Sequence, residues 1–161
     1  MSTDSLKIVA QGDQEIVITR EFDAPRDLVF EAWTTPALLK RWLGVFGGWS
    51  LDVCEIDLRP SGAFRYLWRN ADANLEIRGS YSDIQAPERI VGSEQFVQPF
   101  VSDEAIGTIV FEERNGRTYV RNTVRYTSQA ARDGALQSPM EHGMRASYAA
   151  LDALLAQRDP D

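Results

Sequence analysis

Three polar side chains share strand faces with apolar residues, and at these positions the sequence could do chemistry. In the run from Ile90 to Phe96, alternation places Glu94 on the same face as both apolar ends. Asn122 and Arg20 each lie between apolar residues two positions away. A carboxyl or amide in an apolar cleft can anchor a ligand, and a carboxyl with a shifted pKa can act as a general acid or base.

Two structural interpretations compete with this chemical one. A buried charge costs several kcal/mol unless it is paired, so Glu94 and Arg20 could form an ion pair inside the core. A strand register shifted by one residue would instead turn these groups toward water. The sequence alone leaves the three interpretations open.

Large aromatic residues are predicted on the same inward faces. Each buries about 150–250 Å², so they can form a dry core or line a cleft. Small residues on the last helix could leave room for a neighbouring group or for close helix–sheet packing. Together with Glu94 and Asn122, the predicted ligand-contacting residues are Trp42, Phe46, Phe64, Tyr66, Trp68, Tyr81, Phe96, Phe111, Gly143, Met144 and Ser147.

Other reactive residue types indicate structural roles. Asp52, Glu55 and Asp57 lack the spacing of metal ligands and are interpreted as a solvated strand face. The single histidine, His142, is expected to be exposed or to cap a helix, and Cys54 to be a small core residue. The sequence contains no nucleotide-binding glycine motif and no nucleophile elbow. We therefore predict no metal and no cofactor.

Periodicity and turn signals define the elements that carry these residues. Strands are predicted at 14–22, 50–58, 63–69, 75–84, 90–97, 105–113 and 117–126. Asn115-Gly116 is the strongest hairpin signal between them. Two short helices follow the first strand, with start signals at Pro25 and Pro36. A long amphipathic helix follows the capping box Ser138–Glu141, and its apolar stripe runs from Met140 to Leu155.

This element order predicts an α+β fold in one domain. A curved antiparallel sheet of about six to seven strands would wrap around the long C-terminal helix. The domain is expected to span residues 14–157, after a flexible N-terminus at 1–13 and before a tail at 158–161. The chain has 161 residues, which is an ordinary length for one domain with its own core.

Charge and hydropathy narrow the classes of partner. Lysine and arginine number 17 and aspartate and glutamate 24, so the net charge is −7 with histidine neutral. That sign repels phosphate backbones, and we expect neither nucleic acid nor anionic membrane as partners. No apolar run approaches the roughly 18 residues of a membrane helix, and no signal pattern opens the chain. We expect a soluble, cytoplasmic protein.

Several segments together resemble one known family. The first is ITREFDAPRDLVFEAWTTPALLKRWLG, from Ile18 to Gly44. The others are the turn Arg59–Phe64, Gly79-Ser80-Tyr81, the run APERIV from Ala86 to Val91, Glu94-Gln95-Phe96, Phe111-Glu112-Glu113 and the helix Glu141–Leu155. Over roughly residues 14–157 the chain resembles the family named for homology to the activator of the heat-shock protein 90 ATPase, within the START-like, helix-grip superfamily.

This resemblance implies a cavity between the curved sheet and the C-terminal helix. Relatives in the superfamily bind lipids, sterols, polyketides or plant hormones, and some cyclise aromatic polyketides. The chain departs from the family pattern at Leu43, Val45 and Met144, where the family often has Trp, Pro and Trp. These positions lie at the expected cavity mouth, so a relative's ligand does not transfer to this chain.

Three functions follow from these observations. The first is binding of a small, largely apolar molecule anchored by Glu94, Asn122, Tyr66 or Tyr81. The second is an enzyme of cyclase or hydrolase type that acts on such a molecule with Glu94 as acid or base. The third is a chaperone-regulating interaction module, although we do not expect chaperone binding. Pairing through an exposed sheet edge to form a homodimer is also open.

Overall fold

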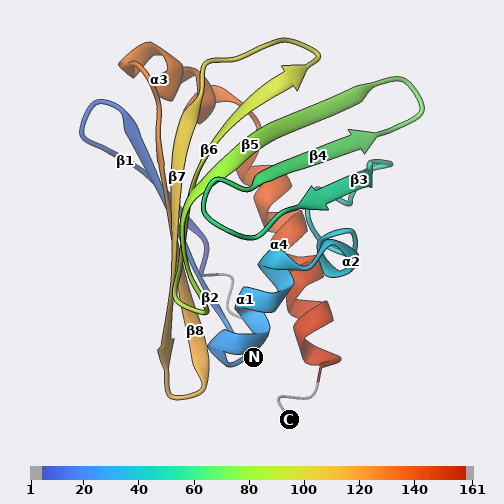
Figure 1. Ribbon diagram of the computed structural model, residues 1–161, viewed down its shortest axis with the longest axis vertical. Coiled ribbons are helices and arrows are strands. Elements are labelled where there is room, and N and C mark those ends of the chain that lie inside the picture. The colour runs from blue at the N-terminus through green and yellow to red at the C-terminus, as the bar shows by residue number, and fades with distance from the viewer. Residues whose placement is uncertain (1–4, 159–161) are drawn as a thin grey trace.

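One antiparallel sheet carries most of the chain (Figure 1). The structure is a computed structural model and describes residues 5–158. The strands are β1 (Lys7–Gln11), β2 (Glu15–Phe22), β3 (Ser50–Ile56), β4 (Ala63–Arg69), β5 (Asn74–Gln85), β6 (Arg89–Gln98), β7 (Ala105–Arg114) and β8 (Arg117–Arg125). Their spatial order is β1-β2-β8-β7-β6-β5-β4-β3. The chain therefore runs as a meander from β3 to β8, and β2 closes against β8.

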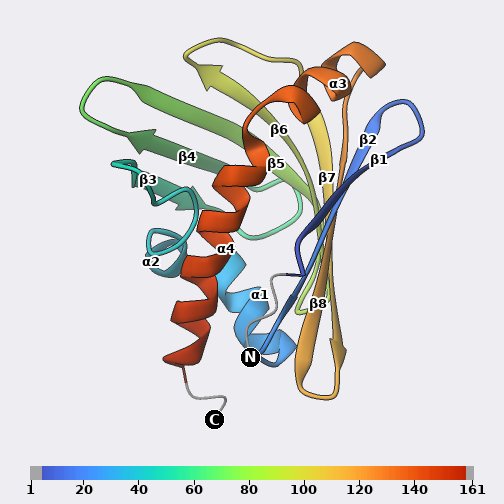
Figure 2. The ribbon, with the colours of Figure 1, turned by 180° about the vertical axis from the view of Figure 1, so that it is seen from behind.

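Four helices accompany the sheet in the described part of the chain: α1 (Arg26–Thr34), α2 (Pro36–Leu39), α3 (Gln129–Gln137) and α4 (Met140–Ala156). The long helix α4 crosses the concave face of the curved sheet, and α1 lies beside the C-terminal half of α4 (Figure 2). This arrangement confirms the predicted α+β helix-grip architecture. The sheet has eight strands, where the sequence predicted six to seven.

The strand faces follow the predicted alternation. On β4, Phe64, Tyr66 and Trp68 all turn toward the concave side and contact one another, with ring centroids 5.3 and 5.8 Å apart. Phe64 pairs with Gly79 on β5, where any larger residue would collide with the Phe64 ring. The aromatic ring thus covers a backbone that has no side chain of its own.

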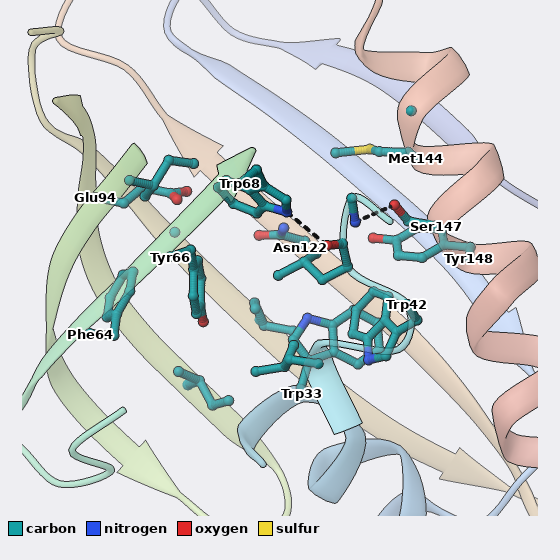
Figure 3. A pocket seen from close by; sticks show the side chains of 18 of the residues that line it. Trp33, Trp42, Phe64, Tyr66, Trp68, Glu94, Asn122, Met144, Ser147 and Tyr148 are labelled. Atoms are coloured by element: carbon teal, nitrogen blue, oxygen red, sulfur yellow. Dashed lines mark hydrogen bonds between the residues drawn. The ribbon is translucent and has the colours of Figure 1, made fainter. Parts of the chain in front are cut away.

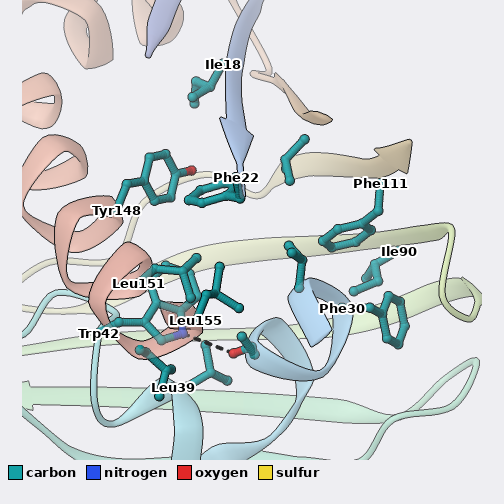
Figure 4. Close-up of a cluster of buried hydrophobic side chains, with 14 of the residues drawn as sticks. Ile18, Phe22, Phe30, Leu39, Trp42, Ile90, Phe111, Tyr148, Leu151 and Leu155 are labelled. Atoms are coloured by element: carbon teal, nitrogen blue, oxygen red, sulfur yellow. Dashed lines mark hydrogen bonds between the residues drawn. The ribbon is translucent and has the colours of Figure 1, made fainter. Parts of the chain in front are cut away.

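The hydrophobic core fills the part of the concave face that α1 and the C-terminal half of α4 cover (Figure 4). Phe22 is fully buried, and its ring lies 5.4 Å from Tyr148 and 5.7 Å from Trp33. The Phe111 ring lies 5.3 Å from Phe30 and 5.5 Å from Trp33 in edge-on geometry. Such edge-to-face contacts add to the stabilisation that burial gives.

Two elements differ from the sequence prediction. Residues 7–11 form strand β1 on β2, although we expected a flexible N-terminus over 1–13. The segment has no clear alternation because both of its faces are largely exposed, with Val9 53% exposed. Helix α3 was also missed, because a buried arginine and not an apolar stripe fixes it. Arg132 donates to the carbonyl oxygens of Gly12 and Glu15, each at 3.0 Å.

The start of α4 also differs from the prediction. The sequence predicted a capping box with Ser138 as the cap, but Pro139 occupies the N-cap position without a side-chain hydrogen bond. Ser138 instead lies at the C-terminal end of α3, where its hydroxyl donates to the carbonyl oxygen of Ala135. The short connection between two helices takes the serine that would otherwise cap the second one.

Candidate functional site

A cavity of about 390 Å³ lies between α4, the loop after α2 and the concave faces of β4 to β8 (Figure 3). It occupies the part of the concave face that the core leaves unfilled, and it is partly open to solvent. Its volume falls within the range of about 300–1,000 Å³ that is typical of small-molecule sites. The walls are mostly aromatic and aliphatic, with a few polar groups among them.

Eleven of the thirteen residues predicted to contact a ligand line this cavity. They are Trp42, Phe46, Phe64, Tyr66, Trp68, Tyr81, Glu94, Asn122, Gly143, Met144 and Ser147. In Figure 3 the strand residues approach from one side, and Met144, Ser147 and Tyr148 approach from α4 on the other. Alternation along the strands and helical spacing along α4 thus bring distant segments around one space.

Phe111 and Phe96 lie outside the cavity lining. Phe111 shares the inner face of β7 with Ile109, which does line the cavity, but α1 covers this end of the strand and buries the ring in the core. Phe96 lies beyond Glu94 toward the end of β6, where its ring packs 5.8 Å from that of Phe100. Both residues are on the predicted face, but other elements occupy the space in front of them.

The proposed ion pair between Glu94 and Arg20 is wrong. Arg20 forms a bidentate salt bridge with Asp152 on α4, with two nitrogen–oxygen distances of 2.7 Å. Its guanidinium also lies 4.7 Å from the centroid of the Phe22 ring. A partner 132 positions away in the chain leaves no local signal. The alternative of a shifted register is also excluded, because Glu94 faces the concave side.

Glu94 is the only charged residue that lines the cavity in the described part of the chain. No hydrogen bond or ion pair from residues 5–158 reaches its carboxyl group. Burial raises the pKa of Glu94 above its ordinary value of 4.5, and no neighbouring cation opposes this shift. Figure 3 shows Glu94 among the residues that line the cavity.

Neutral polar groups also line the cavity. Burial raises the pKa of Tyr81 and of Tyr148 to about 12, and it raises the pKa of Tyr66 well above 10. All three phenols therefore stay protonated at neutral pH. Asn122 projects from β8 and forms no hydrogen bond through its side chain with the described residues. Together these groups offer a ligand both donors and acceptors.

Other polar groups in the wall have structural partners. The Nε1 atom of Trp68 donates to the carbonyl oxygen of Leu43 at 2.8 Å, and the amide of Gly44 donates to the hydroxyl of Ser147 at 2.9 Å. One peptide unit thus links β4 to α4 across the cavity (Figure 3). Gly44 adopts a φ of +71°, and a Cβ atom there would overlap the Trp68 ring. Ser147 therefore fixes the wall, although we predicted that it contacts ligand.

Sequence reasoning missed two cavity-lining glycines, of which Gly107 leaves space open, because a Cβ atom at Gly92 would lie 2.8 Å from the backbone oxygen of Ser80. Gly92 on β6 and Gly107 on β7 are direct cross-strand partners, and both line the cavity. A Cβ atom at Gly107 would meet only the Oδ1 atom of Asn122, at 3.9 Å. Glycine inside a strand often marks a place where another group approaches closely, so a glycine within each predicted strand was the available signal. Trp33 and Tyr148 also line the cavity, and we had not predicted them as ligand-contacting residues.

The remaining candidates have the structural roles that the sequence predicted. Cys54 belongs to the core, and burial raises its pKa to about 11, so it carries no reactive thiolate. Asp52, Glu55 and Asp57 are exposed. His142 is exposed, with its ring 5.8 Å from that of Phe46 at the cavity mouth. Among residues 5–158, no group of three or more potential ligand side chains could hold a metal ion.

Comparison with known families defines the class of this protein. Residues 23–156 match the model of the family described as Activator of Hsp90 ATPase homolog 1-like protein. The match covers most of the chain, so the protein belongs to that family. No curated protein matches the sequence. Within residues 5–158, none of the helices has the length and hydropathy needed to span a membrane.

Solved structures of proteins from other organisms share this fold. A protein from Rhodobacter sphaeroides is 26% identical, with a TM-score of 0.90 over 96% of this chain and 100% of that one. A protein from Staphylococcus epidermidis is 25% identical, with a TM-score of 0.80 over 92% and 93% of the two chains. A Mycobacterium smegmatis protein with a TM-score of 0.80 is 20% identical and shares the fold.

Proposed function

We propose that this protein binds a small, largely apolar molecule in the cavity between the sheet and α4. The observation that carries the proposal is the cavity itself, which has an aromatic wall and only a few polar groups that face empty space. A mostly apolar lining with few fixed polar groups is the usual composition of a small-molecule site. The family supports the proposal, since its fold commonly encloses hydrophobic ligands.

Gly107 supports this proposal over an imperfectly packed core. Protein interiors are close-packed, and even small voids are uncommon. A Cβ atom at Gly107 would meet only one ordinary contact, at 3.9 Å, yet the position has no side chain. Glycine in a strand weakens the strand because it adds backbone freedom to the unfolded chain. A site for a ligand explains why such a residue lies in mid-strand here.

The experiment is binding of a neutral apolar probe, N-phenylnaphthylamine, whose emission rises in apolar surroundings. We expect saturable binding by the wild type and at least about tenfold weaker binding by Gly107→Leu, a change of about 1.4 kcal/mol. The leucine fills cavity volume while the sheet is retained, because the added Cβ meets only one ordinary contact.

Gly134→Ala provides the matched control. Gly134 lies in α3 with no atom within 4 Å of a Cβ added there, so this change alters a glycine outside the cavity. Its binding should equal that of the wild type. Equal binding by the wild type and Gly107→Leu would place the probe elsewhere, and no saturable binding by the wild type would contradict the proposal.

A second candidate function is an enzyme of cyclase or hydrolase type with Glu94 as the acid or base. The specific observation in its favour is the raised pKa of Glu94 in an apolar cavity, which is a common device of general acids. Arg20 takes no part in this, because it is paired with Asp152. Glu94→Gln keeps the shape of the side chain, so unchanged turnover of a substrate by that variant would exclude this mechanism.

A further inference from the structure

We infer that the cavity selects an organic amine, a compact apolar molecule that carries one ammonium group, and that Glu94 forms the ion pair with this group. The inference rests on the proposed function and specifies the chemical class of its ligand. It follows from the charge and position of one side chain and from the rings around that side chain.

The cavity wall carries a negative charge with no cation among the described lining residues to balance it. Glu94 contributes the only formal charge to the wall in the described part of the chain, and no arginine or lysine lies among the lining residues. Elsewhere in the fold a buried charge has its partner within the protein, since Arg20 forms a salt bridge with Asp152. An ammonium group would supply the counter-charge that the protein does not provide for Glu94.

Aromatic rings contact one another along the cavity wall. Phe64 lies 5.3 Å from Tyr66 and 5.0 Å from Tyr81 between ring centroids, and Tyr66 lies 5.8 Å from Trp68. All four rings line the cavity together with Glu94, and Figure 3 shows Phe64, Tyr66 and Trp68 on the strand side of it with Glu94. The faces of aromatic rings are electronegative and attract cations, and cages of such rings are a recurring site for ammonium groups.

The cavity wall disfavours a ligand that carries a negative charge. A carboxylate ligand, such as a fatty acid, would face Glu94 and the phenols without any cationic group in the wall. The whole chain carries a net charge of −7, which also favours the approach of cations over anions. A neutral alcohol could hydrogen-bond to Glu94 or Asn122, but it would leave the charge balance unchanged.

The test compares three probes of one shape: phenylbutylamine, phenylbutanol and phenylbutyrate. Their affinities for the intact protein are measured by isothermal titration calorimetry at neutral pH. We expect the amine to bind at least about tenfold more tightly than the alcohol, and the carboxylate to bind weakest. In Glu94→Gln, which removes the charge and keeps the shape, the preference for the amine should disappear while alcohol binding stays within about threefold.

Glu104→Gln is the matched control. Glu104 is exposed and adjoins the strand residue that pairs with Glu94, so the variant removes the same charge close by but outside the cavity. It should keep the full preference for the amine. Equal binding of the amine and the alcohol to the wild type would overturn this inference and leave the proposed function intact.

Two further outcomes would also overturn the inference. Equal loss of all three probes in Glu94→Gln would mean that Glu94 shapes the cavity and does not select charge. No binding of any probe to the wild type would overturn both this inference and the proposed function. The Gly107→Leu variant separates binding in the cavity from binding at the surface, because it should weaken all three probes together.

Discussion

Two halves of the same concave face have similar side chains and different outcomes. Around Phe22 and Phe111, aromatic rings pack edge to face under α1 and α4, and neither of these two residues lines the cavity. Around Tyr66 and Trp68, comparable rings border an open cavity. Strand alternation is the same in both halves. What differs is whether a helix covers the strand and whether side chains fill the space in front of it, which Gly107 leaves open.

Charged side chains on the inner face show the same division, with Arg20 buried and Glu94 half-buried. In the filled half, Arg20 is 5% exposed and has both terminal nitrogens bound to Asp152. In the open half, Glu94 has no partner among residues 5–158. Thermodynamic stability alone favours the pairing or removal of a charge that is shielded from water, because an unpaired one destabilises the fold. An unpaired charge beside empty space therefore indicates a site for a ligand.

The largest expected effect distinguishes two neighbours on the inner face of β7. Phe111→Ala should lower the free energy of unfolding by about 3–5 kcal/mol, because Phe111 is 1% exposed and its loss opens a void in packed core. Ile109→Ala should cost about 2 kcal/mol, the lower end for such a change, because Ile109 already faces the cavity. Urea denaturation measures both, and equal losses would contradict the division into filled and open halves.

An intermediate effect is expected from the paired charge in the filled half. Asp152→Asn should lower the free energy of unfolding by about 2 kcal/mol, because it leaves the buried Arg20 without its counter-charge. The loss stays below the range for fully buried pairs, since the Asp152 side chain is 40% exposed. Asp133→Asn is the control on Arg132, which keeps its two carbonyl acceptors, and should cost less than about 1 kcal/mol. A similar loss in the free energy of unfolding for the two variants would contradict a larger contribution from the salt bridge between Arg20 and Asp152.

The smallest effect concerns Glu94 and its pH dependence. Burial raises the pKa of this carboxyl in the folded state, so the folded protein holds the proton more tightly than the unfolded chain does. The resulting stabilisation is complete below the ordinary value of 4.5 and is lost as pH rises through the raised pKa. Relative to the wild type, Glu94→Gln should therefore gain stability from pH 4.5 upward, measured by thermal unfolding. A difference that is constant with pH would contradict an unpaired Glu94.

Glu76 provides the reference for this pH series. It lies on β5, is 1% exposed and accepts hydrogen bonds from Arg65, Arg78 and Gln98. The hydrogen bond from Arg65, followed by that from Arg78, lowers the pKa of Glu76 despite its burial. Its contribution to stability is therefore present above pH 4.5 and is lost as pH falls through the lowered pKa. Two glutamates on paired strands thus have pKa values shifted in opposite directions, because only one has cationic partners.

Local patterns in the sequence predicted most of the fold. Alternation gave the strands from β2 to β8 to within about two residues, since side chains in a half-buried strand repeat every second position. The same rule placed Glu94 and Asn122 on the inner face. Strand β1 was not predicted because its exposed faces show no alternation, and α3 was not predicted because Arg132 holds it through backbone carbonyls.

Contacts between distant segments were beyond prediction. The partner of Arg20 lies on α4, and no local pattern connects the two residues. The positions of Phe111 and Phe96 depend on which element covers each strand end, and alternation carries no information on that. The facing glycines become visible only when the register of β6 and β7 is known. Sequence periodicity thus identifies a face, while packing decides whether that face is core or cavity.

Native mass spectrometry of the wild type and of Gly107→Leu tests the central claim most directly. Both proteins are purified in the same way, incubated with phenylbutylamine and measured under non-denaturing and denaturing conditions. The wild type should carry an extra mass that denaturation releases, and Gly107→Leu, with its cavity filled, should carry little or none. The same adduct on both proteins, or a bare wild type, would contradict a ligand site in this cavity.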